Sequence, residues 1–89
     1  MEYVCALLAV RDMERSKQFY CGLLGMEITN DFGANVTLSG GVALQTAGSW
    51  QEFLGLSEDQ ITFENCAAEL YFEEADLDAF LQRLAVWPD

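Results

Sequence analysis

The chain contains one local pattern twice: an apolar run, then an aspartate, then leucines and a phenylalanine at helical spacing. The first run, Tyr3–Val10, is followed by Asp12, and the second, Ala68–Glu73, is followed by Asp76. The two aspartates lie 64 positions apart (76 − 12). A repeat at fixed spacing indicates two copies of one structural unit. The sequence stops at residue 89, so we expect a second unit truncated after its first strand and helix.

Turn residues and alternating apolar positions divide the first half into short elements. Asp12 is of the residue type preferred at a helix N-cap, and Gly25 is of the type that ends a helix. Gly40 and Gly41 predict a two-residue hairpin turn. The expected elements are a strand over Tyr3–Val10, a helix from Asp12 to Gly25, and strands over Met26–Phe32, Asn35–Ser39 and Val42–Ala47. This β-α-β-β-β order places the chain in the α+β class.

The second half begins with a connecting region. Ser49-Trp50-Gln51-Glu52 matches a capping box, which predicts a short helix over Trp50–Leu54 that ends at Gly55. Residues 57–66 predict a surface loop. After the strand over Ala68–Glu73, Asp76 is expected to cap a helix with an apolar stripe formed by Leu77, Phe80, Leu81 and Leu84. We expect one domain over residues 1–89, with a first module (1–47), a connection (48–66) and an incomplete second module (67–89).

Two stretches of the chain resemble a known superfamily. The first stretch is Ala6-Leu-Leu-Ala-Val-Arg-Asp-Met-Glu-Arg-Ser-Lys-Gln-Phe-Tyr20, continuing to Leu23-Leu24-Gly25-Met26. It is similar to the opening of the glyoxalase/bleomycin-resistance/extradiol-dioxygenase (vicinal oxygen chelate) superfamily. The second stretch, Glu69–Leu84, resembles the start of the second module in proteins of this superfamily. The resemblance implies two β-α-β-β-β modules whose sheets curl around one cleft. Members range from lyases and dioxygenases to drug-sequestering proteins, so the resemblance leaves the reaction open.

The resemblance also implies metal ligands at inward-facing strand positions. These positions fall on Cys5, approximately on Gln45, and on Glu69, and a fourth would lie on a last strand that this sequence lacks. The family pattern has His or Glu at these positions, whereas this chain has no histidine. A Gln amide is a poor ligand beside thiolate, imidazole or carboxylate. We therefore expect no metal cofactor, and a divalent metal on these three residues is the alternative.

Alternation along the predicted strands indicates which side chains face the cleft. If Cys5 faces inward, Tyr3, Leu7 and Ala9 share its face. Val4, Ala6, Leu8 and Val10 then pack under the first helix. By the same rule Gln45, Glu69, Tyr71 and Glu73 face inward, and Trp50 of the short helix flanks the cleft entrance. The candidate ligand-binding cleft is therefore lined by Tyr3, Cys5, Leu7, Gln45, Trp50, Glu69, Tyr71 and Glu73. The alternative is that the large apolar members fill a core between the sheets, Glu69 lies near solvent, and Trp50 and Phe53 cover core instead of flanking the cleft entrance.

The chain is strongly acidic, with 15 Asp and Glu against four Lys and Arg and a formal net charge of −11. Duplex DNA and anionic membranes bind proteins through clustered Lys and Arg side chains, so neither is an expected partner. A cationic ligand or a basic partner fits this charge better. The alternative is that the charge serves solubility through self-repulsion.

Cysteine usage and hydropathy predict the cellular setting. The chain has three cysteines, Cys5, Cys21 and Cys66, and they lie far apart in the sequence. An odd number at this spacing indicates neither a disulfide framework nor a zinc knuckle. The longest apolar run, Val4–Val10, is too short to span a bilayer, and no signal peptide is indicated. We expect a cytoplasmic protein.

Three functions remain open from the sequence. The first is binding of a small molecule, possibly a cationic one, in the cleft between modules and without the usual metal set. The second is a metal-dependent lyase or dioxygenase whose site is completed by a missing segment or a partner subunit. The third is a dimer scaffold without a ligand. An open sheet edge and an uncovered apolar face favour pairing with another chain, so we expect a homodimer in each case.

Overall fold

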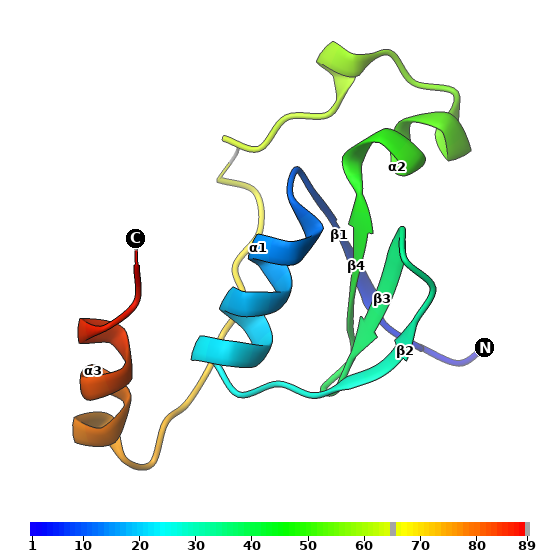
Figure 1. Ribbon diagram of the computed structural model, residues 1–89. Coiled ribbons are helices and arrows are strands. Elements are labelled where there is room, and N and C mark those ends of the chain that lie inside the picture. The colour runs from blue at the N-terminus through cyan, green and yellow to red at the C-terminus, as the bar shows by residue number, and fades with distance from the viewer. Residues whose placement is uncertain (65, 89) are drawn as a thin grey trace.

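The computed structural model describes residues 1–64 and 66–88. Its first half is a four-stranded sheet in the order β1-β4-β3-β2 (Figure 1). The strands are β1 (Ala6–Val10), β2 (Ile28–Asp31), β3 (Asn35–Leu38) and β4 (Val42–Thr46). β1 pairs with β4 in parallel, and the other two pairings are antiparallel. The expected β-α-β-β-β unit of the α+β class is confirmed.

The first helix begins and ends where the sequence predicts. The Asp12 carboxylate accepts a 3.1 Å hydrogen bond from the Arg15 backbone N–H, which caps α1 (Met13–Lys17). The helix continues as a π-helical stretch, η1 (Gln18–Leu23). Gly25 follows with φ of 78°, a left-handed conformation that glycine adopts without steric cost.

One face of the sheet and α1 form the core. Met13 of α1 packs with Val36, Leu38 and Leu44, and all four are buried. Leu8 and Val10 of β1 pack against this cluster, as predicted. The same prediction is wrong for Val4 and Ala6, which are exposed: Val4 lies before the strand, and Ala6 is the first residue of the strand.

The β3–β4 hairpin differs from the prediction by one residue. Leu38 pairs with Val42, so three residues, Ser39, Gly40 and Gly41, join the strands instead of the two predicted. Gly40 and Gly41 have φ of 83° and 82°, which explains why glycine occupies both positions. A two-residue turn would have set Ser39 opposite Val42, so the longer turn shifts the register of the whole strand pair.

The connection contains the helix α2 (Ala47–Leu54), which ends at Gly55 as predicted. The capping box predicted at Ser49 is wrong, because the helix starts earlier and its N-cap is Thr46. Inside the helix, Ser49 Oγ donates a 2.9 Å hydrogen bond to the Thr46 carbonyl. A capping box occurs instead at Ser57, before the short 3₁₀ helix η2 (Glu58–Gln60).

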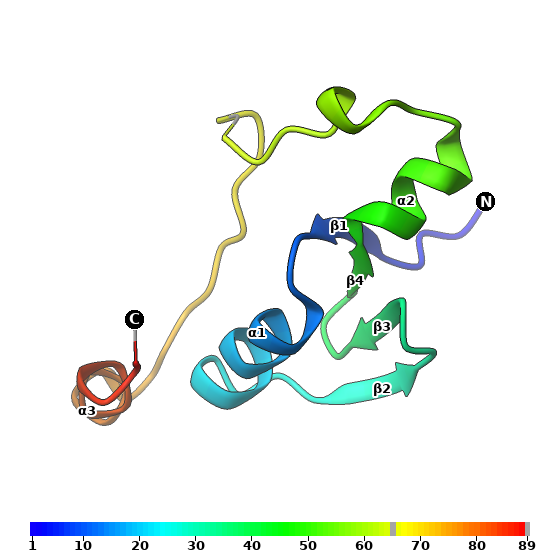
Figure 2. The same ribbon diagram turned by 45° about the horizontal axis from the view of Figure 1, so that its top comes forward.

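The expected second module (67–89) contains the helix α3 (Leu77–Ala85), and Asp76 caps it as predicted by accepting a 3.0 Å hydrogen bond from the Ala79 N–H. The strand predicted over Ala68–Glu73 is wrong for this chain. That segment is extended but pairs with no strand among the described residues, and it runs past α1 on the side away from the sheet (Figures 1 and 2). Strand structure requires a paired neighbour, and the described residues form no second sheet to supply one.

α3 does not lie on a sheet of its own among the described residues, and the residues after its end contact the first helix. The Trp87 ring contacts Phe19 of η1 edge-on, with 6.0 Å between ring centroids. Leu77, Leu81 and Leu84 of the predicted stripe remain exposed. Within the described residues, no helix has the length and apolar character needed to cross a bilayer.

Candidate functional site

The sheet has a second face, turned away from the α1 core. Alternation puts Leu44 and Val36 on the α1 side, so their strand neighbours lie on this second face. Register pairs Leu7 with Ala43 and Ala9 with Gln45 across β1 and β4. It also pairs Gln45 with Asn35 and Ala43 with Thr37 across β4 and β3. We call this surface the open face and define it by Leu7, Ala9, Asn35, Thr37, Ala43 and Gln45.

Two amides form the polar part of the open face. Asn35 Nδ2 donates a hydrogen bond of 3.0 Å to Gln45 Oε1. Gln45 is only 8% exposed and is the buried polar residue of the described chain. A side-chain amide has two N–H donors and one carbonyl acceptor. After this bond the pair still offers the Gln45 amide N–H groups as donors and the Asn35 carbonyl as an acceptor, which are the groups needed to orient a polar ligand.

The sequence predicted Gln45 in the cleft but missed Asn35. With the predicted two-residue turn, Asn35 would lie opposite Thr46. The three-residue turn places it opposite Gln45 instead. The paired glycines could have indicated Asn35, because a hairpin loop of three residues, the next most common kind after two, gives the observed register.

The predicted cleft residues divide into two groups. Leu7 and Gln45 share the open face, and Cys5 precedes β1 and is half-buried. Tyr3 is 76% exposed, and its ring lies next to Gly41, the residue directly before β4. Trp50 lies half-buried on α2, and Phe53 on the same helix is exposed.

The second group is not brought to the open face. Glu69, Tyr71 and Glu73 lie on the extended segment that passes α1 on the side away from the sheet (Figure 2). All three are exposed. The Tyr71 hydroxyl donates a 3.2 Å hydrogen bond to Glu73 Oε1, so these two residues contact one another rather than Gln45.

The three family ligand positions do not fit a metal ion in this chain. Gln45 Oε1, the atom that would coordinate, accepts the Asn35 hydrogen bond. Glu69 lies on the extended segment beyond α1, whereas Cys5 and Gln45 belong to the sheet region. Among the described residues, no three His, Cys, Asp or Glu side chains are grouped closely enough to hold a metal. No chemistry of this site is therefore derived through a metal.

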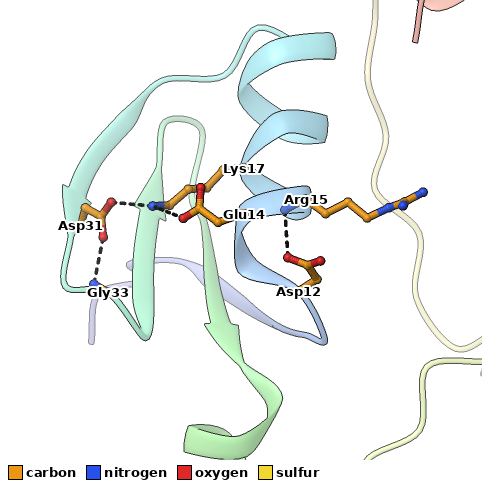
Figure 3. Close-up of polar contacts among 6 residues, drawn as sticks. All are labelled: Asp12, Glu14, Arg15, Lys17, Asp31 and Gly33. Carbon is orange, nitrogen blue, oxygen red and sulfur yellow. Dashed lines mark hydrogen bonds and ion pairs between the residues drawn. The ribbon is translucent and has the colours of Figure 1, made fainter. Parts of the chain in front are cut away.

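The main ion-pair network lies away from the open face and ties the first helix to the sheet (Figure 3). Lys17 Nζ lies 2.8 Å from Asp31 Oδ2 and 3.5 Å from Glu14 Oε1. Asp31 Oδ1 also accepts a hydrogen bond from the Gly33 N–H. The hydrogen bond from Lys17, followed by that from Gly33, lowers the pKa of Asp31. The same bond to Asp31 raises the pKa of Lys17. These residues join α1 to β2 and contribute to the fold, not to the candidate site.

Comparison with known proteins gives the family. A family model described as "Glyoxalase-like domain" matches residues 3–88. A solved structure from Agrobacterium tumefaciens str. C58, described as a protein of unknown function, is 35% identical with a TM-score of 0.77, and the match covers 96% of this chain and 68% of that one. No curated protein matches. The β-α-β-β-β sheet and these matches together show that the chain belongs to the glyoxalase-like domain family.

Proposed function

We propose that this glyoxalase-like domain binds a small organic molecule on its open face, over the Asn35–Gln45 amide pair. The observation that carries the proposal is this pair: two amides, hydrogen-bonded to each other, on a surface otherwise formed by Leu7, Ala9, Thr37 and Ala43. Small-molecule sites combine apolar walls with a few placed polar groups. Here the side chains around the amide pair are small or apolar, and the amides would supply the orienting hydrogen bonds.

The charge of the chain supports a cationic ligand. A formal net charge of −11 attracts cations over distances comparable with the screening length of the solution. Glu69 and Glu73 act in this proposal as part of the general negative field, since both lie on the extended segment rather than on the open face. Added salt should therefore weaken binding of a cation by a modest amount.

The site would work with groups of this chain alone. An amide pair binds by hydrogen bonding and needs no bound metal. The competing function is a metal-dependent lyase or dioxygenase whose ligands come partly from a partner subunit or from a further segment. One divalent metal per chain after purification in Zn²⁺, Ni²⁺, Fe²⁺ or Mn²⁺ would favour that function over ours.

We also propose that the chain forms a homodimer. β1 is an edge strand of the sheet. On α3, the apolar stripe of Leu77, Leu81 and Leu84 is exposed, with Leu81 at 49%. Unpaired strand edges and exposed apolar stripes both favour association with another chain. In this proposal the second copy covers part of this apolar surface.

Calorimetry with a panel of small cationic aromatic compounds and their neutral analogues tests the binding proposal. Gln45→Leu removes the amide and should weaken the tightest binder about tenfold, the loss of roughly one ligand hydrogen bond. Gln82→Leu on α3 is the matched control and should bind like the wild type. Ala9→Leu places a larger side chain beside Gln45, keeps the amide pair and should also block binding. Absence of binding across the panel, or equal binding by the Gln45 and Gln82 variants, would reject the proposal.

A further inference from the structure

We propose that a second site, centred on Arg11 and separate from the open face, binds the carboxylate of a small organic acid. The topology of the sheet creates this site. β1 and β4 run parallel, with Val10 opposite Thr46, so the residues that follow, Arg11 and Ala47, emerge side by side at the same end of the sheet. α2 starts at Ala47, and the chain beyond η2 returns to Arg11 (Figure 1).

Arg11 is held by an aromatic ring rather than by an acid. Its guanidinium carbon lies 4.3 Å from the centroid of the Phe63 ring. Stacking on a ring face occupies the flat side of the guanidinium and leaves the N–H groups at its edge able to donate. Those N–H groups match the two oxygens of a carboxylate in a bidentate arrangement.

Other cations of this acidic chain have carboxylate partners. Lys17 pairs with Asp31 and Glu14, and Arg83 Nη2 lies 3.6 Å from Glu74 Oε2. In the part of the chain that the structure describes, Arg11 forms no such pair, although Glu58 and Glu64 line the two hollows beside it. Arg11 therefore presents a positive charge that the described residues do not neutralise by contact.

Two hollows meet at the Arg11–Phe63 pair. One, of about 390 Å³, lies between α2 and the returning chain and includes Gln51 and Glu58 in its lining. The other, of about 550 Å³, is lined by Arg11 and residues 61–64. Both include Ile61 in their lining. These volumes fall within the range of ordinary small-molecule sites.

The lining defines the class of acid. Phe63 and Ile61 offer an apolar wall for the body of the molecule, and Gln51 offers an amide. Glu58 in the same hollow and Glu64 in the other hollow repel a second negative charge. The site thus suits a monocarboxylic acid with an apolar body, and it disfavours a phosphate dianion.

NMR titration of the ¹⁵N-labelled full chain tests the proposal, with benzoate as the probe, benzamide as its neutral isostere and phenylphosphate as the dianion. Benzoate should shift the amide signals of residues 47–51 and 58–63, and benzamide should leave them unchanged. Arg11→Gln should weaken benzoate binding by about tenfold or more, as expected for a lost charge-assisted pair. Arg83→Gln changes the net charge equally at a distant ion pair, and it should leave the affinity unchanged.

A variant of Glu58 gives a second test of the site. Glu58→Gln should strengthen benzoate binding and admit phenylphosphate, and this variant decides the question if Arg11→Gln fails to fold. Equal weakening by the two arginine variants, equal binding of benzamide, or preference of the wild type for phenylphosphate would overturn the proposal. So would the absence of benzoate shifts in these segments. Shifts on the open face would bear on the proposed function and not on this site.

Discussion

Asn35 donates its side-chain amide to Gln45 across the β3–β4 pair, with 3.0 Å between Nδ2 and Oε1. Gln45 occupies approximately the position at which the superfamily resemblance implies a metal ligand. In this chain its carbonyl oxygen is taken by a neutral hydrogen bond. The open face therefore has the chemistry of a hydrogen-bonding surface, and the first prediction concerns the bond itself.

Asn35→Ala should destabilise the fold by about 1 to 3 kcal/mol, the usual cost of leaving a buried polar group without its partner. Gln45, at 8% exposure, has little access to water as a replacement. The double variant Asn35→Val, Gln45→Leu removes both polar groups and should recover most of this loss. Urea denaturation monitored by circular dichroism measures both. If the double variant loses as much stability as the Asn35→Val and Gln45→Leu variants lose together, the two side chains are not coupled.

The ion pair between α1 and β2 predicts the behaviour of the chain in acid. The folded pKa of Asp31 lies below its ordinary value of 3.8, because Lys17 and the Gly33 N–H both bond its carboxylate. Its contribution to stability is therefore present above pH 3.8 and is lost as the pH falls through the lower folded pKa. Lys17→Met should raise the pKa of Asp31 in an NMR titration. Arg83→Met should not, and an unchanged Asp31 pKa in the Lys17 variant would contradict the assignment.

How far the sequence predicted this structure is clearest in the hairpin. Apolar periodicity and turn residues gave the order of the strands, the cap at Asp12 and the sides on which Leu8 and Gln45 lie. These features depend on local chemistry. The register between β3 and β4 depends on whether two or three residues form the turn, and Ser39-Gly40-Gly41 is compatible with both. That single residue decides whether Gln45 or Thr46 lies opposite Asn35.

The second half was harder to predict for a different reason. Ala68–Glu73 has the composition of a strand, and Asp76 caps the helix as its sequence indicates. A helix satisfies its backbone hydrogen bonds within itself, whereas a strand needs a neighbour. The helix therefore forms here, and the apolar segment before it stays unpaired among the described residues. For the same reason Glu69 does not reach the sheet.

The two helix caps should differ in their effect on stability. Asp12→Ala removes the cap of a helix whose Met13 is buried in the core, and it should cost about 1 kcal/mol of global stability. Asp76→Ala removes the cap of α3, which has no buried residue in the described chain, and it should mainly lower helicity and speed amide exchange in α3. Asn at either position retains the cap and serves as control. A Asp76→Ala variant with as large a loss in the urea midpoint as Asp12→Ala would contradict this difference.

The proposed homodimer predicts an effect of charge on α3. Leu81→Lys places a cation within the exposed apolar stripe and should shift the chain toward the monomer in light scattering at micromolar concentration. Gln82→Lys introduces the same charge at the neighbouring position outside the stripe and should leave the dimer intact. A wild-type chain that is monomeric at this concentration would reject the dimer.

The central claim is that the open face around the Asn35–Gln45 pair is the ligand site, and chemical-shift mapping tests it most directly. The tightest binder from the cationic panel is titrated into the ¹⁵N-labelled chain, with the side-chain amides of Asn35 and Gln45 observed together with the backbone. We predict that the largest shifts fall on these two side chains and on Thr37 and Ala43, and that in Gln45→Leu the remaining shifts need about tenfold more ligand to reach their midpoint. Shifts confined to other surfaces, or unchanged in that variant, would contradict the account.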